Sequence, residues 1–203
     1  MNERAPSDPT EADNPSLSSL SGRSILLAVT GGIAAYKAAA LTSTLVKAGA
    51  SVRIVMTESA TRFVGRLTFQ SLSGRPVITS IWDADDRPDA QHIAIAREAD
   101  LMVIAPATAN LIAKLAAGLC DDPVSLAATA LPADRPLAIA PAMNADMWAN
   151  PIVQRNLRHL AEMLPSLTII EPDSGWQACR TEGAGRMAEP DRIAATLAEM
   201  LKS

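Results

Sequence analysis

An α/β fold with a single, doubly wound and mostly parallel sheet is predicted by two features of this 203-residue chain. Short apolar runs alternate with longer segments of helical periodicity, which is the pattern of a sheet covered by helices on both faces. Three of the strand-to-helix junctions also carry Gly, Ser, Thr or Asn, and such sheets bind their ligands at this edge. The length is that of one domain with a sizeable core.

Composition narrows the classes of function. Hydrophobic residues make up 48% of the chain and charged residues 20%, as in a soluble globular protein. The net charge of −4 and the lack of a Lys/Arg cluster argue against nucleic acid as a partner. No apolar run is long enough to cross a membrane, and no secretory signal opens the chain. Two cysteines without pair or metal spacing predict a cytoplasmic protein without a metal site.

The first 22 residues differ in composition from the rest. They are rich in Pro, Ser, Asp and Glu and have little to bury, which predicts a disordered tail. A docking arm is the alternative interpretation. The folded domain is therefore expected over residues 23–203, beginning near Arg23.

The folded part opens with a strand, a glycine turn and a helix. Residues 24–29 are apolar, Thr30-Gly31-Gly32 follows, and residues 33–48 show helical spacing that ends at Gly49. Glycines let the backbone approach a phosphate, and a helix N-terminus offers free N–H groups and positive potential. Neither G-x-G-x-x-G nor a P-loop is present, so a tight turn without a ligand remains the alternative.

The alternation continues along the chain. Thr57 and Ser59 follow the second strand, and their hydroxyls can cap a helix or bind a phosphate. Thr108 and Asn110 follow a later strand in a similar turn. Further strands are expected over residues 51–56, 100–105, 136–140 and 167–170, with a short extended piece over 77–82 and a polar loop over 83–90. Further helices are expected over residues 60–72, 111–119, 124–130, 151–164 and 191–201.

Two stretches have compositions that are unusual for segments that only connect strands and helices. Residues 141–148 follow a buried strand and place one Asn, two Met and one Trp in a turn, where Gly, Ser or Asp is usual. The alternative interpretation is a helix cap, in which Asn144 accepts a backbone N–H while Met147 and Trp148 pack the first turn. Residues 173–190 hold three glycines and no periodicity, which predicts a flap without secondary structure over a site.

Because the chain has few histidines and cysteines, each of them can be interpreted individually. His92 precedes a helical turn and a strand, so it is expected near the ligand edge, or else as a solvated or capping residue. His159 is expected on the surface of a helix. Cys120 is expected to be a small buried residue.

From residue 24 to residue 201 the sequence resembles the homo-oligomeric flavin-containing cysteine decarboxylases. It is most similar to the phosphopantothenoylcysteine decarboxylase branch, whose bacterial members are often fused to a synthetase. The motifs that carry the resemblance are Thr30-Gly31-Gly32-Ile33-Ala34-Ala35-Tyr36-Lys37, Pro106-Ala107-Thr108-Ala109-Asn110, the Pro, Met-Asn and Met-Trp of residues 141–148, and Ala178-Cys179 with Gly183, Gly185, Arg186 and Met187. The last set resembles the family's substrate clamp.

The resemblance implies a cofactor, an assembly and a set of contacts. It implies FMN, held by Gly31, Gly32, Ile33, Thr57, Ser59, Thr108, Ala109, Asn110 and Leu111. It implies a homotrimer, or an assembly of trimers, with sites at the subunit contacts. It also implies substrate contacts from Asn144, Met147, Ala178 and Met187, and we expect a further substrate contact from Arg180.

The implied substrate ends in a cysteine with a free carboxylate. Oxidation of its thiol by FMN gives a thioaldehyde, whose C=S bond accepts the electrons when CO₂ leaves and an ene-thiol forms. We assign His92 as the base in thiol oxidation, because an imidazole ordinarily titrates near neutrality, and Asn144 as the holder of the carboxylate. The resemblance assigns Cys179 as the proton donor that completes reduction to phosphopantetheine, a step of coenzyme A biosynthesis.

Alternative functions follow from one position at which the chain departs from the family pattern. The family pattern has Gly after the clamp cysteine, whereas this chain has Arg180. Arg180 is expected to grip a phosphate or a peptide carboxylate, or to point to solvent. A peptidyl-cysteine decarboxylase, which makes an aminoenethiol in a peptide natural product, is therefore the second hypothesis. A non-catalytic flavin-binding regulatory subunit is the third, although it has no need of His92, Asn144 and Cys179 together. A flavin prenyltransferase does not suit the 141–148 motif.

Overall fold

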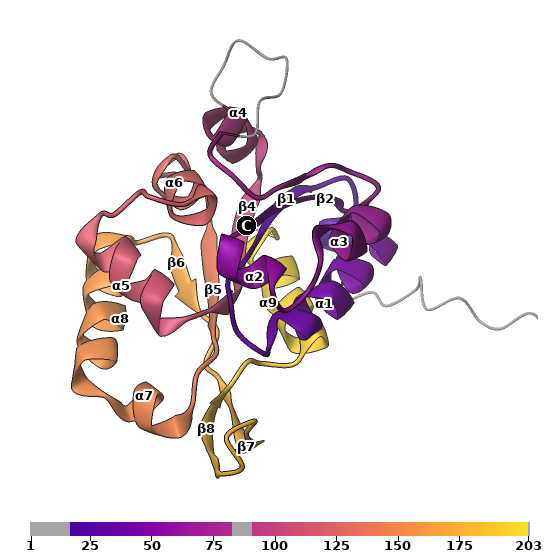
Figure 1. Ribbon diagram of the computed structural model, residues 1–203. Helices are drawn as coiled ribbons and strands as arrows, with labels where there is room; N and C mark the ends of the chain where they lie inside the picture. The colour runs from indigo at the N-terminus through magenta and orange to yellow at the C-terminus, as the bar shows by residue number, and fades with distance from the viewer. Residues whose placement is uncertain (1–16, 83–90, 203) are drawn as a thin grey trace, which may run out of the picture.

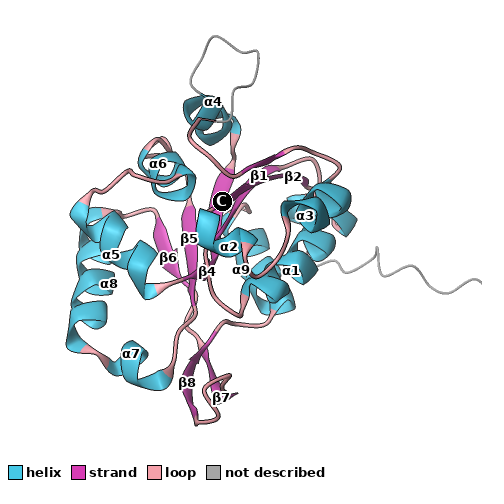
Figure 2. Cartoon of the chain, viewed as in Figure 1, coloured by secondary structure: helices cyan, strands magenta, loops and turns pink. Residues whose placement is uncertain are grey.

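A six-stranded parallel sheet forms the centre of the computed structural model, which describes residues 17–82 and 91–202 (Figures 1 and 2). The strand order is β3-β2-β1-β4-β5-β6. The strands are β1 (Ser24–Val29), β2 (Ser51–Met56), β3 (Val77–Ile78), β4 (Leu101–Ala107), β5 (Leu137–Pro141) and β6 (Leu167–Ile169). Because all neighbours in this sheet pair in parallel, the predicted doubly wound α/β fold is confirmed.

Helices cover both faces of the sheet. They are α1 (Ala35–Lys47), α2 (Glu58–Thr61), α3 (Arg66–Ser73), α4 (Gln91–Glu98), α5 (Ala109–Ala117), α6 (Pro123–Thr129), α7 (Ala145–Ala149), α8 (Pro151–Met163) and α9 (Pro190–Met200). One core lies beneath α1, α3 and α9, and the other beneath α4, α5, α6 and α8 (Figure 1). Among the described residues, no helix is long and apolar enough to span a membrane.

Strand β1 shows how the sequence supplies both cores. Ile25, Leu27 and Val29 lie in the α1 and α9 core, whereas Leu26 and Ala28 lie in the opposite one. Successive side chains of a strand point to opposite faces, so a continuous apolar run is needed where both faces are covered. This explains why β1 carries no polar alternation.

The strand order reverses between β1 and β4, and this point positions the site. From β1 the chain moves outward through β2 and β3, and then returns to pair β4 with the other side of β1. The connections after β1 and β4 therefore leave in opposite directions and open a crevice at the carboxyl edge.

Several element boundaries differ from the sequence prediction. The helix expected over residues 60–72 is divided into α2 and α3, because Gly65 is extended, with φ −67° and ψ 144°, and caps α3. The extended piece expected over 77–82 pairs only at Val77–Ile78. The polar loop expected over 83–90 lies outside the described residues.

The packed chain also begins earlier than expected. The end of the expected tail forms a short 3₁₀ helix at Ser18–Leu20, where Leu20 is fully buried and Ser19 Oγ donates to the carbonyl of Ala198, 2.6 Å away. Residues 1–16 lie outside the described part. Cys120, which was expected to be buried, is only half-buried, with Sγ 3.2 Å from Thr129 Oγ1, and His159 is exposed as expected.

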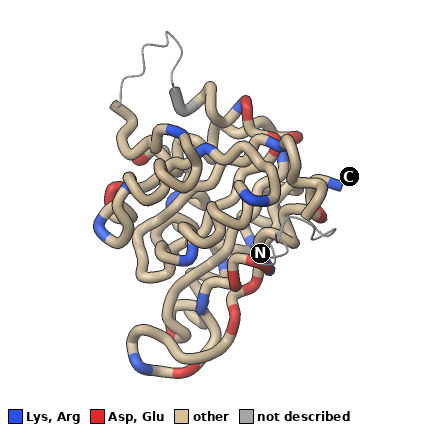
Figure 3. Tube along the Cα trace, turned by 90° about the vertical axis from the view of Figure 1, so that its right-hand side faces the viewer, with Lys and Arg blue, Asp and Glu red and all other residues tan. Residues whose placement is uncertain are grey.

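The largest difference is in the expected flap. Instead of lacking secondary structure, it folds into an antiparallel hairpin of β7 (Asp173–Trp176) and β8 (Glu182–Arg186). Figure 3 shows this hairpin standing out from the body of the fold, with charges of both signs along it. Glycine has no side chain, so the glycines of this hairpin interrupt the alternation of apolar and polar side chains by which a strand is recognised in a sequence.

Candidate functional site

A cavity of about 1090 Å³ lies at the carboxyl edge of the sheet. The connections after β1, β2, β4 and β5 line it on one side, and the β7–β8 hairpin lines it on the other. All residues expected to hold the cofactor border this cavity: Gly31, Gly32, Ile33, Thr57, Ser59, Thr108, Ala109, Asn110 and Leu111. It is also bordered by Asn144, Met147, Ala178, Cys179 and Met187 from the expected catalytic and substrate sets.

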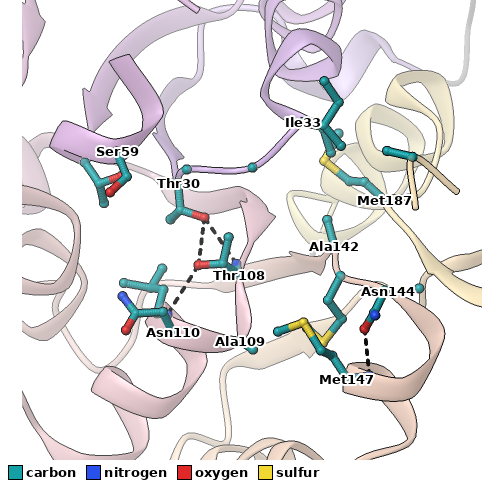
Figure 4. Close-up of a pocket in the computed structure, with 18 of the residues that line it drawn as sticks. Thr30, Ile33, Ser59, Thr108, Ala109, Asn110, Ala142, Asn144, Met147 and Met187 are labelled. Carbon is teal, nitrogen blue, oxygen red and sulfur yellow. Dashed lines mark hydrogen bonds between the residues drawn. The ribbon is translucent and has the colours of Figure 1, made fainter. Parts of the chain in front are cut away.

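Thr30 and Thr108 connect the two central strands at the floor of the cavity. Thr30 Oγ1 donates to the carbonyl of Pro106 at 2.7 Å and accepts from the backbone N–H of Thr108 at 3.1 Å. Thr108 Oγ1 in turn accepts from the N–H of Leu111 at 3.4 Å and so caps α5. Figure 4 shows the two threonines between Ser59 and Asn110 on one side and Asn144, Met147 and Met187 on the other. No local pattern in the sequence indicates this role of Thr30.

The two glycines of the first turn differ in their surroundings. A Cβ on Gly31 would lie 2.4 Å from Cβ of Ser59 and 2.8 Å from its carbonyl carbon, so only glycine lets the two connections meet. A Cβ on Gly32 would meet Thr108 Cγ2 at 3.7 Å, an ordinary contact. Thr57 Oγ1 accepts from the N–H of Ala60 at 3.2 Å and caps α2. Gly31 is therefore the position that brings the hydroxyls of the second connection to the cavity.

Asn144 has the capping role and also borders the cavity. Its Oδ1 accepts from the N–H of Met147 at 2.8 Å, so the capping interpretation of this motif is confirmed (Figure 4). Its Nδ2 makes no hydrogen bond to another described residue. The cap fixes the orientation of the amide and leaves two N–H donors for a ligand. Met147, which is 45% exposed, lies beside it.

The hairpin contributes a thiol and a buried methionine. Cys179 is exposed, and its Sγ lies 2.9 Å from Thr181 Oγ1 and 3.6 Å from Gln177 Oε1. Met187, at the end of the hairpin, is 1% exposed.

Arg180 is not among the residues that border the cavity. It is exposed, it makes no ion pair with a described residue, and its φ of 64° is left-handed. The turn thus keeps a conformation that favours glycine, although it holds an arginine.

Two lysines at the cavity were missed by the sequence analysis. Lys37 is 7% exposed, and its Nζ donates to the carbonyl of Met187 at 3.0 Å and to Glu189 Oε1 at 2.7 Å. Its position on the buried face of a predicted helix was the available signal, because a buried lysine needs a partner.

Lys114 lies in an acidic corner of the cavity. Its Nζ is 2.6 Å from Asp121 Oδ1 and 2.8 Å from Asp122 Oδ2. The side-chain hydrogen bonds raise the pKa of Lys114, and the bond from Lys114 lowers the pKa of Asp121. The pair is therefore ionised at neutral pH, and it leaves no unpaired cation in this corner.

His92, like Arg180, is an expected site residue that is not among the described residues bordering the cavity. It is the second residue of α4, and its side chain lies outside the described residues. Helix α4 precedes β4 and so reaches the amino edge of the sheet, whereas the cavity lies at the carboxyl edge. Figure 1 shows α4 at the opposite end of the molecule from α7 and the hairpin. The expectation that His92 lies near the ligand edge of its own chain is therefore not supported.

The profile of the family described as Flavoprotein matches residues 13–202. The chain belongs to this family. Among curated flavoprotein relatives, the coenzyme A biosynthesis bifunctional protein CoaBC of Bacillus subtilis is 49% identical over 174 residues, which are 86% of this chain and 42% of that protein. CoaBC of Escherichia coli is 46% identical over 172 residues, or 85% and 41% of the two chains. The chain thus spans less than half the length of these relatives.

Similarity to solved flavoprotein structures narrows the group to which the chain belongs within the family. A cysteine-to-serine variant of PPC decarboxylase, complexed with pantothenoylaminoethenethiol, is 34% identical with a TM-score of 0.80, covering 89% of this chain and 99% of that one. The FMN-dependent cysteine decarboxylase SpaF is 30% identical with a TM-score of 0.77, covering 91% and 99%. The FMN-binding protein AtHal3 is 35% identical with a TM-score of 0.74, covering 86% and 94%. Within its family the chain is grouped with the FMN-dependent cysteine decarboxylases.

Proposed function

We propose that the cavity binds FMN and converts 4′-phosphopantothenoylcysteine into 4′-phosphopantetheine, in the cytoplasm, as a step of coenzyme A biosynthesis. One observation carries the proposal. A single cavity joins a glycine- and threonine-lined edge of the sheet to the amide of Asn144 and the thiol of Cys179, which come from separate segments of the chain. The named function of the CoaBC relatives and the PPC decarboxylase structure support the choice of substrate.

The residues at the sheet edge fit the cofactor. Gly31 lets the first connection lie against Ser59 without a side chain between them, and the hydroxyls of Thr57 and Ser59 stand at a helix start. This is the chemistry of a phosphate site. Thr108, Ala109 and Asn110 begin α5 at the next junction and would border the flavin ring. The cavity volume of about 1090 Å³ accommodates a cofactor and a substrate together.

When bound, FMN supplies an acceptor for the two electrons that leave the substrate as its thiol carbon is oxidised. In the proposal, His92 takes the thiol proton, a role suited to a group that titrates near neutrality. Asn144 holds the carboxylate through Nδ2 while its Oδ1 remains bonded to α7. The neutral amide N–H donors orient the carboxylate. A full positive charge in their place would stabilise the carboxylate and so oppose its loss as CO₂.

The last step needs a proton at a substrate carbon. Loss of CO₂ from the thioaldehyde leaves an ene-thiol, which takes up a hydride equivalent at one carbon and a proton at the other to become the saturated product. Cys179 is exposed at the cavity and carries the proton in this proposal. Ala178, Met147 and Met187, which border the cavity, would form the contacts around the substrate, and Arg180 would reach the substrate only from the hairpin tip outside the cavity.

A homotrimer, or an assembly of trimers, completes the proposal by bringing His92 of one subunit to the cavity of another. Its support is that the cavity rim holds Ile33 and Tyr36, which are 61% and 59% exposed. Leu67 of α3 is 70% exposed. Exposed apolar side chains of this size usually mark a contact surface. Sedimentation of the purified protein at several concentrations measures the assembly, and a monomer that turns over substrate would contradict it.

Anaerobic turnover of the purified yellow protein with phosphopantothenoylcysteine tests the reaction. We expect CO₂, saturated phosphopantetheine and a flavin spectrum that returns to the oxidised form. A bleached flavin with an ene-thiol product two hydrogens lighter would instead indicate a peptide-modifying enzyme. No reaction with this substrate or with peptides ending in cysteine would contradict the proposal and favour the non-catalytic alternative.

A further inference from the structure

The hairpin and the 141–148 motif meet along a seam that is built mainly of backbone. The N–H of Met143 donates to the carbonyl of Gly185 at 2.9 Å. A Cβ on Gly185 would lie 2.4 Å from the carbonyl oxygen of Met143, and one on Gly183 would lie 2.6 Å from Cβ of Ala145. The two segments therefore approach more closely than side chains would allow.

One long polar side chain is buried in this seam. Gln177 is 6% exposed, and its Nε2 donates to the carbonyls of Ala184 and Gly183 at 3.1 and 3.4 Å. Its Oε1 accepts from the N–H of Ala145 at 3.0 Å, and the thiol of Cys179 donates to the same oxygen at 3.6 Å. The amide thus uses both ends within the protein, and one oxygen serves two segments.

We propose that Gln177 is a positioning residue that sets the thiol of Cys179 against the amide of Asn144. Ala145, whose N–H it holds, is the first residue of α7 and directly follows Asn144. No other described side chain forms hydrogen bonds with both Cys179 and the start of α7. The inference rests on the proposed function, in which Asn144 acts before CO₂ leaves and Cys179 acts after it.

The chemistry explains why an amide is suited to this position. A carbonyl oxygen that accepts from S–H fixes the direction of the thiol proton, and an amide does so without placing a charge beside the sulfur. Thr181 Oγ1, 2.9 Å from Sγ, can donate to the sulfur at the same time. In the final step one proton passes from Sγ to a substrate carbon, the other carbon receives a hydride equivalent, which the reduced cofactor would supply, and the thiolate is reprotonated from solvent. An oriented, protonated thiol is therefore the form required.

Gln177→Leu removes the side-chain bonds and keeps the backbone bonds that close the hairpin tip, from Gln177 N–H to Thr181 and from Arg180 N–H to Gln177. We expect the ratio of ene-thiol to saturated product to rise about tenfold, since a hydrogen bond of this kind is worth about that factor. We expect the alkylation rate of Cys179 by iodoacetamide, followed on its own peptide by mass spectrometry, to rise by a similar factor. Glu182→Gln, on the same hairpin and outside the cavity, is the matched control and should change neither.

Wild-type product ratio and wild-type alkylation rate in Gln177→Leu would overturn the proposal. A lower turnover with the product ratio and the alkylation rate both unchanged would also overturn it, because it indicates a merely structural role. Gln177→Met, which keeps the length without polar atoms, replaces Gln177→Leu if that variant does not accumulate as yellow protein. If the wild-type enzyme makes no saturated product, the proposed function fails, while the alkylation rates still test Gln177.

Discussion

The two sides of the cavity are held in different ways. On the cofactor side, Thr30, Gly31 and Thr108 stand at the ends of central strands whose residues are buried on both faces. On the proposed substrate side, strands β7 and β8 of the hairpin lie outside both apolar cores, and the hairpin tip is exposed at Ala178, Cys179 and Arg180. It is fastened by Lys37 at its base and by Gln177 at its tip.

This difference predicts that the two sides of the cavity differ in the free energy needed to open them. The cofactor side can open only with the sheet, whose disruption costs most of the global unfolding free energy. The hairpin can open locally at the cost of a few hydrogen bonds. We therefore expect a fixed cofactor site facing a substrate side that moves during turnover, and the following experiments separate the two.

The largest effect is expected at His92, which lies on neither side of the cavity within its own chain. His92→Asn should lower turnover by about 10²- to 10⁴-fold, the contribution of a general base, while the protein stays yellow. Anaerobic CO₂ release and the flavin spectrum measure the two properties. Activity within a few-fold of the wild type would show that another group is the base.

Asn144→Asp tests the residue where the two sides meet. The carboxylate still accepts from the N–H of Met147, so α7 keeps its cap, but it repels the substrate carboxylate and cannot donate to it. Loss of one such donor lowers kcat by about 10²- to 10³-fold. Steady-state kinetics at neutral pH measure the change, and an unchanged melting temperature serves as the control for the fold.

The two glycines of the first turn give a matched test of the cofactor side. Gly31→Ala should destabilise the fold by about 1–3 kcal/mol and weaken flavin binding, because its Cβ overlaps Ser59. Gly32→Ala finds an ordinary contact and should leave stability unchanged within about 0.5 kcal/mol. Urea unfolding of both apoproteins checks this, and equal effects would contradict the geometry.

Lys37→Met tests the base of the hairpin. It leaves the carbonyl of Met187 without its donor, at an expected cost of about 1–3 kcal/mol. Because that carbonyl ends the hairpin, we expect KM for the substrate to rise more than kcat falls. Glu189→Gln, which removes the ion pair and keeps an acceptor for Lys37, should have a smaller effect.

The smallest effect is expected at Arg180. Arg180→Gly relieves a left-handed conformation that costs a non-glycine residue about 1 kcal/mol, so the tip should open less often. Slower cleavage of the hairpin by a nonspecific protease would report this. Faster cleavage would show instead that the guanidinium holds the tip in place.

The sequence analysis placed the connections that border the cavity correctly, because their signals are local. The strand over 24–29, the turn at Gly31 and the caps at Thr57 and Thr108 are each specified by residues within a few positions of one another. The hairpin was missed because its glycines carry no alternation. The contacts of Lys37 with Met187 and of Gln177 with Ala145 join residues 150 and 32 positions apart, and no spacing rule predicts them.

The position of the hairpin outside both cores also bears on how such an enzyme can evolve. A substitution at its tip changes what the cavity meets without disturbing the packing on which folding depends. Arg180 illustrates this, because the chain tolerates an arginine in a glycine conformation at that place. Under the proposed function, substitutions in this one ribbon could therefore change the substrate contacts of the cavity while leaving the sheet edge as it is.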